Sequence, residues 1–75
     1  MPLVEIKFFE GELSEAQMQE VIEKVTDVLV SLSGEGLREA TWVVVQEVKS
    51  GHWGVGVKAL GLDDIRAIQE GDPNR

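Results

Sequence analysis

A helical pattern between two apolar strand patterns constrains the fold of this chain more than any other feature. In residues 1–9, apolar and charged side chains alternate from position 4 to position 8, and Leu3 and Phe9 add apolar residues to the second face. Residues 41–48 form the strand pattern richest in β-branched side chains. Strands with two apolar faces are usually parallel and buried, so we expect a first strand that is covered on both sides.

The segment between these strands has the spacing of an amphipathic helix. Ser14 and Gln17 form a capping-box sequence at its start, and Gly34 suits the left-handed conformation that ends many helices. One apolar stripe is predicted to pack, and it consists of Met18, Val21, Ile22, Val25, Val28, Leu29 and Leu32. Strand, helix and strand predict an α/β fold, a single right-handed β-α-β unit with parallel strands.

Such a unit cannot complete a core from one chain. Two strands leave sheet edges unpaired and one sheet face uncovered. A chain of 75 residues forms one domain with a modest core, and without cysteine no disulfide can stabilise it. We therefore expect the sheet to be extended by self-association.

Charge and composition exclude several classes of function. Fourteen acidic and seven basic residues give a net charge of -7, which disfavours nucleic acid and anionic membranes as partners. No apolar run approaches the roughly 20 residues that span a bilayer, and no signal peptide is recognisable, so we expect a cytoplasmic protein. A single histidine, His52, with scattered carboxylates predicts neither a metal site nor a cofactor.

The carboxy-terminal part has two predicted features. Three glycines within residues 51–56 predict tight turns or a hairpin. Leu62, Ile65 and Ile68 then predict a short helix that docks on a neighbour, and residues 71–75 are expected to form a frayed tail.

Taken together, these motifs resemble the 4-oxalocrotonate tautomerase family of the tautomerase superfamily. The resemblance covers residues 2 to about 60, with residues 61–75 as an added helix and tail. Its elements are Pro2 at the start of a strand, Glu10-Gly11 at the end of that strand, the helix, Gln46-Glu47 closing the second strand, and Gly51-His52-Trp53-Gly54-Val55-Gly56. The resemblance implies a β-α-β protomer, assembled as a hexamer built from three dimers.

The resemblance also implies an isomerase whose base is Pro2. Removal of Met1 would make Pro2 the amino terminus, and its secondary amine would move a proton within an enol or unsaturated keto acid. Burial in an apolar pocket lowers the pKa of such an amine toward the working pH. By resemblance, Phe9, Trp53 and Val55 line that pocket.

Two departures from the family concern substrate binding. Glu12 and Trp42 stand where the diacid-processing members have arginines that bind a carboxylate and polarise a carbonyl. We therefore predict that both positions contact substrate and that the substrate is not a dicarboxylate. Lys7, Arg38 and the indole NH of Trp42 or Trp53 are the candidate replacement donors.

Two alternative functions stay open. In a hydratase or hydrolytic dehalogenase of the same superfamily, a protonated Pro2 would donate a proton while Glu12 activates water. In a hetero-oligomer, the chain would be a catalytically silent subunit; the missing arginines favour this reading and the retained Pro2 disfavours it.

Overall fold

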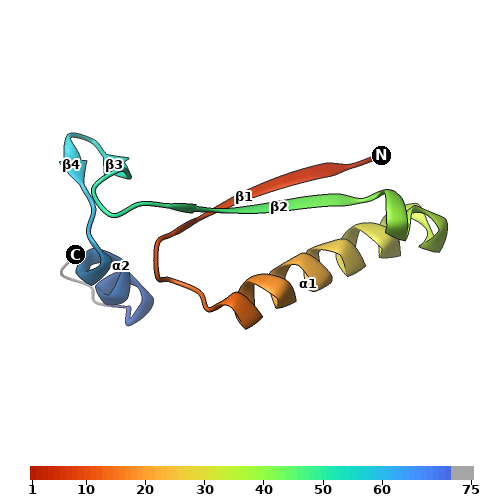
Figure 1. Cartoon of the computed structure of the whole chain (residues 1–75), viewed down its shortest axis with the longest axis horizontal. Helices are drawn as coiled ribbons and strands as arrows, with labels where there is room; N and C mark the ends of the chain where they lie inside the picture. The colour runs from red at the N-terminus through yellow and green to blue at the C-terminus, as the bar shows by residue number, and fades with distance from the viewer. Residues whose placement is uncertain (72–75) are drawn as a thin grey trace.

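The computed structural model describes residues 1–71 and confirms the predicted β-α-β unit with a carboxy-terminal hairpin and helix (Figure 1). All but the first residue of the predicted frayed tail lies outside the described residues. The elements in chain order are strand β1 (Leu3–Phe9), helix α1 (Glu15–Ser33), 3-10 helix η1 (Glu35–Ala40), strand β2 (Trp42–Val48), strands β3 (Gly54–Val55) and β4 (Lys58–Ala59), and helix α2 (Leu62–Gln69).

The two long strands are parallel and in register from end to end. Leu3 lies opposite Trp42, and Phe9 lies opposite Val48. α1 runs along one face of this pair, and the other face is open (Figure 1). Leu3 and Trp42, which lie on the open face, are 56% and 60% exposed. The first strand is therefore covered on one side within a single chain, whereas its sequence predicted cover on both.

Both predicted ends of α1 are confirmed. The Ser14 hydroxyl accepts a hydrogen bond from the Gln17 backbone N–H at 3.1 Å, and the Gln17 side chain accepts from the Ser14 N–H at 2.9 Å. Gly34 ends the helix with φ +103°, and its N–H donates to the carbonyl of Val30 at 2.8 Å. These interactions satisfy backbone groups that a helix end leaves without partners.

The predicted apolar stripe of α1 is only partly correct. Val28 and Leu32 are 60% and 81% exposed, whereas Val30, which the stripe omits, is 5% exposed. A sheet of two strands is too narrow to cover the whole apolar surface of the helix. In addition, η1 packs against α1 beside the end where Val30 lies (Figure 1).

A single chain encloses little core. Among residues 1–71, the buried hydrophobic side chains are Phe9, Val30 and Leu60. The radius of gyration is 15.3 Å, whereas a compact domain of this length would have about 11 Å. This elongated shape agrees with a protomer whose remaining apolar surface is covered by other chains.

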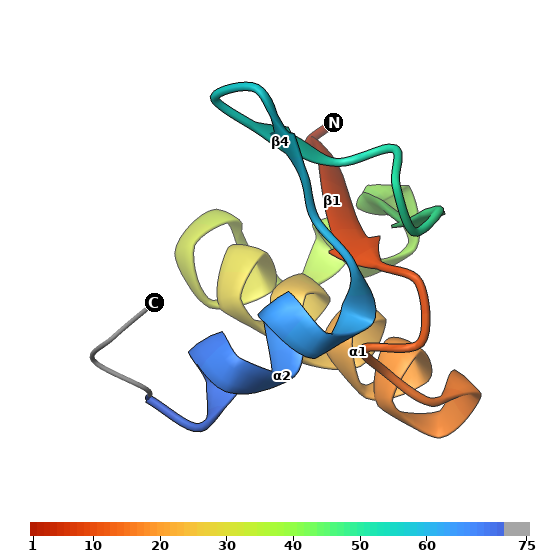
Figure 2. The same ribbon diagram turned by 90° about the vertical axis from the view of Figure 1, so that its left-hand side faces the viewer.

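The hairpin and α2 lie at one end of the molecule, and the amino terminus lies at the other (Figures 1 and 2). β3 and β4 pair antiparallel around Gly56, which has φ +62°. Among residues 1–71, no helix is long and apolar enough to cross a membrane. The cytoplasmic location stays a prediction from the sequence.

Candidate active site

Pro2 directly precedes β1, at the end of the sheet where the amino terminus lies. Its carbonyl accepts a hydrogen bond from the Trp42 backbone N–H at 3.0 Å, which extends the parallel ladder to this residue. Pro2 is half-buried, while Met1 is 83% exposed. The peptide bond that must be cleaved to free the Pro2 amine therefore lies at an accessible terminus.

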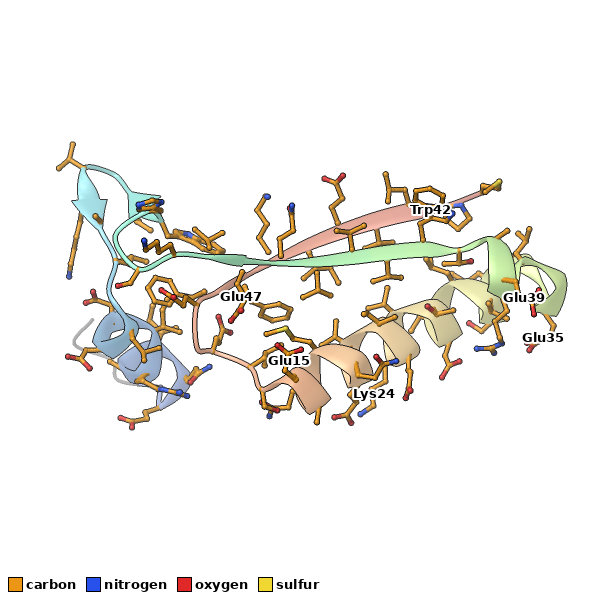
Figure 3. The ribbon with its side chains drawn as sticks, in the orientation of Figure 1. Glu15, Lys24, Glu35, Glu39, Trp42 and Glu47 are labelled. Atoms are coloured by element: carbon orange, nitrogen blue, oxygen red, sulfur yellow. The ribbon has the colours of Figure 1, made fainter. Side chains whose placement is uncertain are left out.

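Trp42 is the predicted site residue that shares this end with Pro2. Its side chain lies on the sheet face away from α1 (Figure 3). At 60% exposure, the indole is free to pack against a ligand or another chain. The structure thus brings the candidate base and one candidate substrate-binding residue together.

The remaining predicted site residues lie at the opposite end. Phe9 follows Pro2 by seven positions in an extended chain, a separation of about 23 Å at a rise of about 3.3 Å per residue. The other predicted residues at this end are Glu12, Trp53 and Val55. Glu12 belongs to the turn, and the other two belong to the hairpin region; both segments lie beyond the end of β1 (Figure 1). One chain therefore does not bring all six predicted residues into one pocket.

The side chains at this second end differ in accessibility. Phe9 is 1% exposed and belongs to the core of the chain, whereas Val55 is 60% exposed on the hairpin. Trp53 is half-buried. The role of Phe9 in a pocket stays a prediction, and within one chain its ring serves packing.

Glu12 is directed back onto its own turn. Its Oε1 accepts a hydrogen bond from the Phe9 N–H at 3.2 Å, and the Glu12 N–H donates to the Phe9 carbonyl at 3.0 Å. One carboxylate oxygen of Glu12 is therefore engaged in holding the chain reversal after β1.

Two more carboxylates support the same turn, and the sequence did not single out either as a site residue. Glu47 Oε2 accepts from the Gly11 N–H at 3.2 Å, and Glu10 Oε2 accepts from the Ser50 N–H at 3.1 Å. Figure 3 shows Glu47 at this end of β2. Three carboxylates thus lie in or beside this turn.

The structure places two candidate replacement donors in other roles. Lys7 donates from Nζ to Gln46 Oε1 at 2.8 Å on the open sheet face. Arg38 forms ion pairs with Glu35 and Asp27, each at 2.7 Å. The hydrogen bonds that Arg38 donates to Glu35 and then to Asp27 raise the pKa of Arg38, and the bond that Glu35 accepts lowers the pKa of Glu35. The charge of Arg38 is therefore compensated within the chain.

Arg66 of α2 is a cation at the turn that sequence reasoning missed. Its Nη2 donates to the Gly11 carbonyl at 3.2 Å, although the two residues are 55 positions apart. No local sequence signal could have revealed this contact, because it depends on where α2 packs.

An open apolar groove on α1 contains none of the predicted site residues. It is lined by Leu13, Gln17, Glu20, Val21, Lys24 and Val25. Together with the exposed Val28 and Leu32, it forms part of the apolar surface that one chain leaves uncovered.

The comparisons with known proteins concern the β-α-β unit and the hairpin. Residues 2–63 match the family model described as "Tautomerase enzyme". The chain is 38% identical over 55 residues to "Probable tautomerase SAV1363" of Staphylococcus aureus strain Mu50, which covers 73% of this chain and 87% of the relative. No solved structure matches the chain.

Two further relatives have similar coverage. "Probable tautomerase SSP1389" of Staphylococcus saprophyticus is 34% identical over 55 residues, 73% of this chain and 87% of the relative. "Probable tautomerase SH1546" of Staphylococcus haemolyticus is 33% identical over 55 residues, 73% of this chain and 86% of the relative. The parallel β-α-β fold, the family match and these relatives agree, and the chain belongs to the tautomerase family.

Proposed function

We propose that Pro2, exposed by removal of Met1, is the general base of this tautomerase. The observation that carries the proposal is the position of Pro2 at the start of β1, held by the 3.0 Å hydrogen bond from Trp42 beside a Met1 that is 83% exposed. A neutral secondary amine accepts a proton from the enol hydroxyl. The resulting ammonium returns a proton to carbon, which releases the carbonyl compound and regenerates the amine.

The complete site would form between copies of the chain. Pro2 and Trp42 lie at one end of the sheet, and Glu12, Trp53 and Val55 lie at the other. A neighbouring copy can place its turn and hairpin beside Pro2 of the first copy. We propose a homohexamer, because family membership suggests self-association and the resemblance implies this subunit number.

The substrate class that this site favours is an enol or unsaturated keto acid with fewer than two carboxylates. Glu10, Glu12 and Glu47 surround the turn that would face the substrate. A second substrate carboxylate would meet like charges there, in a protein whose net charge is -7. Like charges that approach in a partly buried site repel more strongly than in water.

The test is tautomerisation of phenylenolpyruvate by the full-length protein, after mass spectrometry has shown whether Met1 is absent. Pro2→Ala keeps a primary amine of different basicity and shape, and general-base catalysis contributes about 100- to 10,000-fold. We expect kcat/KM to fall by at least about 100-fold while sedimentation shows an unchanged assembly. An unchanged rate would remove Pro2 from the mechanism.

A further inference from the structure

α2 lies beside the turn that follows β1. A Cβ placed on Gly11 would lie 3.8 Å from a methyl group of Leu62, so the side chain of the first residue of α2 lies close to the turn. An ion pair of 3.1 Å between Lys58 and Asp64 joins β4 to the first turn of α2. Arg66, in the next turn of α2, donates to the carbonyl of Gly11.

The guanidinium of Arg66 has only neutral partners among residues 1–71. Nη2 donates to the Gly11 carbonyl and Nη1 donates to Gln69 Oε1, both at 3.2 Å. No ion pair joins Arg66 to a carboxylate in this part of the chain. A guanidinium has five N–H donors, and three of them have no partner among residues 1–71. Arg66 is exposed, so its guanidinium is accessible from solvent.

The carboxylates of the same turn form no ion pair with Arg66. Each accepts a hydrogen bond from a backbone N–H instead: Glu12 from Phe9, Glu47 from Gly11 and Glu10 from Ser50. By contrast, the guanidinium of Arg38 is held by two carboxylates. Among residues 1–71, Arg66 is thus a guanidinium without an ion-pair partner, at the end of the sheet that carries the hairpin with Val55.

We infer that Arg66 binds the carboxylate of a monocarboxylate enol, with α2 supplying the cation that the turn itself lacks. The inference rests on the proposed tautomerase function and on a site that combines Pro2 of one copy with the turn of another. A guanidinium binds a carboxylate through two parallel N–H···O bonds, which also orients the substrate. One guanidinium at this turn binds one substrate carboxylate. A second substrate carboxylate would face Glu10, Glu12 and Glu47.

This role is specific to the added helix. The family match ends at residue 63, so Arg66 lies beyond the matched residues. Selectivity for a single carboxylate would therefore come from a segment outside the matched residues. The catalytic proline lies within the matched residues.

The experiment compares phenylenolpyruvate with its methyl ester, which has no charge, as substrates of the full-length protein. Arg66→Gln should lower kcat/KM for the acid by about 10- to 100-fold, the loss expected for a charge-assisted hydrogen bond. Most of this loss should appear as a raised KM. Activity on the ester should change by less than about threefold, because the ester offers no carboxylate to the guanidinium.

Two variants separate carboxylate binding from general electrostatics and from folding. Lys49→Gln removes the same charge from an exposed residue near the turn, because Lys49 precedes Ser50, whose N–H donates to Glu10. It should change the ratio of kcat/KM for the acid to kcat/KM for the ester by less than about threefold. Arg66→Lys keeps the charge but not the two-pronged geometry, and it should give an acid activity between those of wild type and Arg66→Gln.

The outcomes distinguish this inference from the proposed function. If wild type converts neither substrate in a Pro2-dependent way, the proposed function fails and this inference fails with it. If wild type converts both substrates but Arg66→Gln lowers them equally or not at all, only the inference is overturned. Equal effects of Lys49→Gln and Arg66→Gln on the acid would also overturn it.

Discussion

The open face of β1 and β2 allows a direct test of self-association through Val44→Lys. Val44 is 37% exposed on this face, and Glu5 lies opposite it in the parallel register. In an isolated chain the new lysine would face water and could form an opposite-charge pair with Glu5, worth about 0.2–1 kcal/mol. The substitution should therefore not unfold the protomer.

The same substitution should strongly oppose assembly if another copy covers this face. The desolvation penalty for a buried ion is several kcal/mol, and attraction to Glu5 offsets only part of it. With a net cost of about 2–3 kcal/mol per copy, and two copies in a two-fold interface, the total is about 4–6 kcal/mol. Because each 1.4 kcal/mol is tenfold, the dissociation constant should rise by about 1,000- to 10,000-fold.

Sedimentation velocity across a range of protein concentrations measures this change, and circular dichroism checks that the variant is folded. Gln19→Lys is the matched control, since it adds the same charge at an exposed position of α1. The control should assemble like wild type, whereas Val44→Lys should sediment as a smaller species at micromolar concentration. A Val44→Lys protein with wild-type assembly, or a wild type that is a stable monomer, would refute the reasoning.

Three further predictions concern stability, each measured by urea unfolding at constant protein concentration. Ser14→Ala removes the hydroxyl that accepts from Gln17 and should destabilise the protein by about 1 kcal/mol; a change below about 0.3 kcal/mol would contradict the capping role. Phe9→Ala empties a site that is 1% exposed and should cost about 3–5 kcal/mol, and wild-type stability would argue against a core role. The hydrogen bond from Arg38 lowers the pKa of Glu35 in the folded state. Glu35 therefore stabilises the folded protein above its unfolded pKa of about 4.3, and this stabilisation is lost as pH falls through the folded pKa. Glu35→Gln should therefore be less stable than wild type near neutral pH and equal to it in acid, and a difference independent of pH would contradict this linkage.

The sequence by itself determined the features that depend on neighbouring residues. The capping box of Ser14 and Gln17 joins groups three positions apart, so its residues identify it without further information. Gly34 and Gly56 mark a helix end and a hairpin turn because their positive φ values suit glycine. Alternation and helical spacing likewise determined the β-α-β order. Composition indicated that one chain could not complete its core, and the three buried hydrophobic side chains among residues 1–71 agree with that expectation.

Only the tertiary structure decided which surfaces and charges meet. Val30 is buried while Val28 and Leu32 are exposed, because the width of the sheet and the position of η1 determine which part of α1 is covered. The periodicity of the helix contains no information about that width. The predicted site residues were likewise chosen by type and resemblance, and β1 carries them to opposite ends of the sheet.

The charges around the turn after β1 show most clearly the difference between what local sequence and what tertiary contacts determine. By resemblance, Glu12 stands where the diacid-processing family members have an arginine, but the sequence does not show that its carboxylate accepts a hydrogen bond from the Phe9 N–H. Arg66 reaches Gly11 across 55 positions of sequence. The side chain of Leu62 lies close to Gly11, and an ion pair joins Lys58 of β4 to Asp64 of α2. Local patterns specify the elements, whereas the charge at this end of the sheet depends on contacts between segments that are distant in sequence.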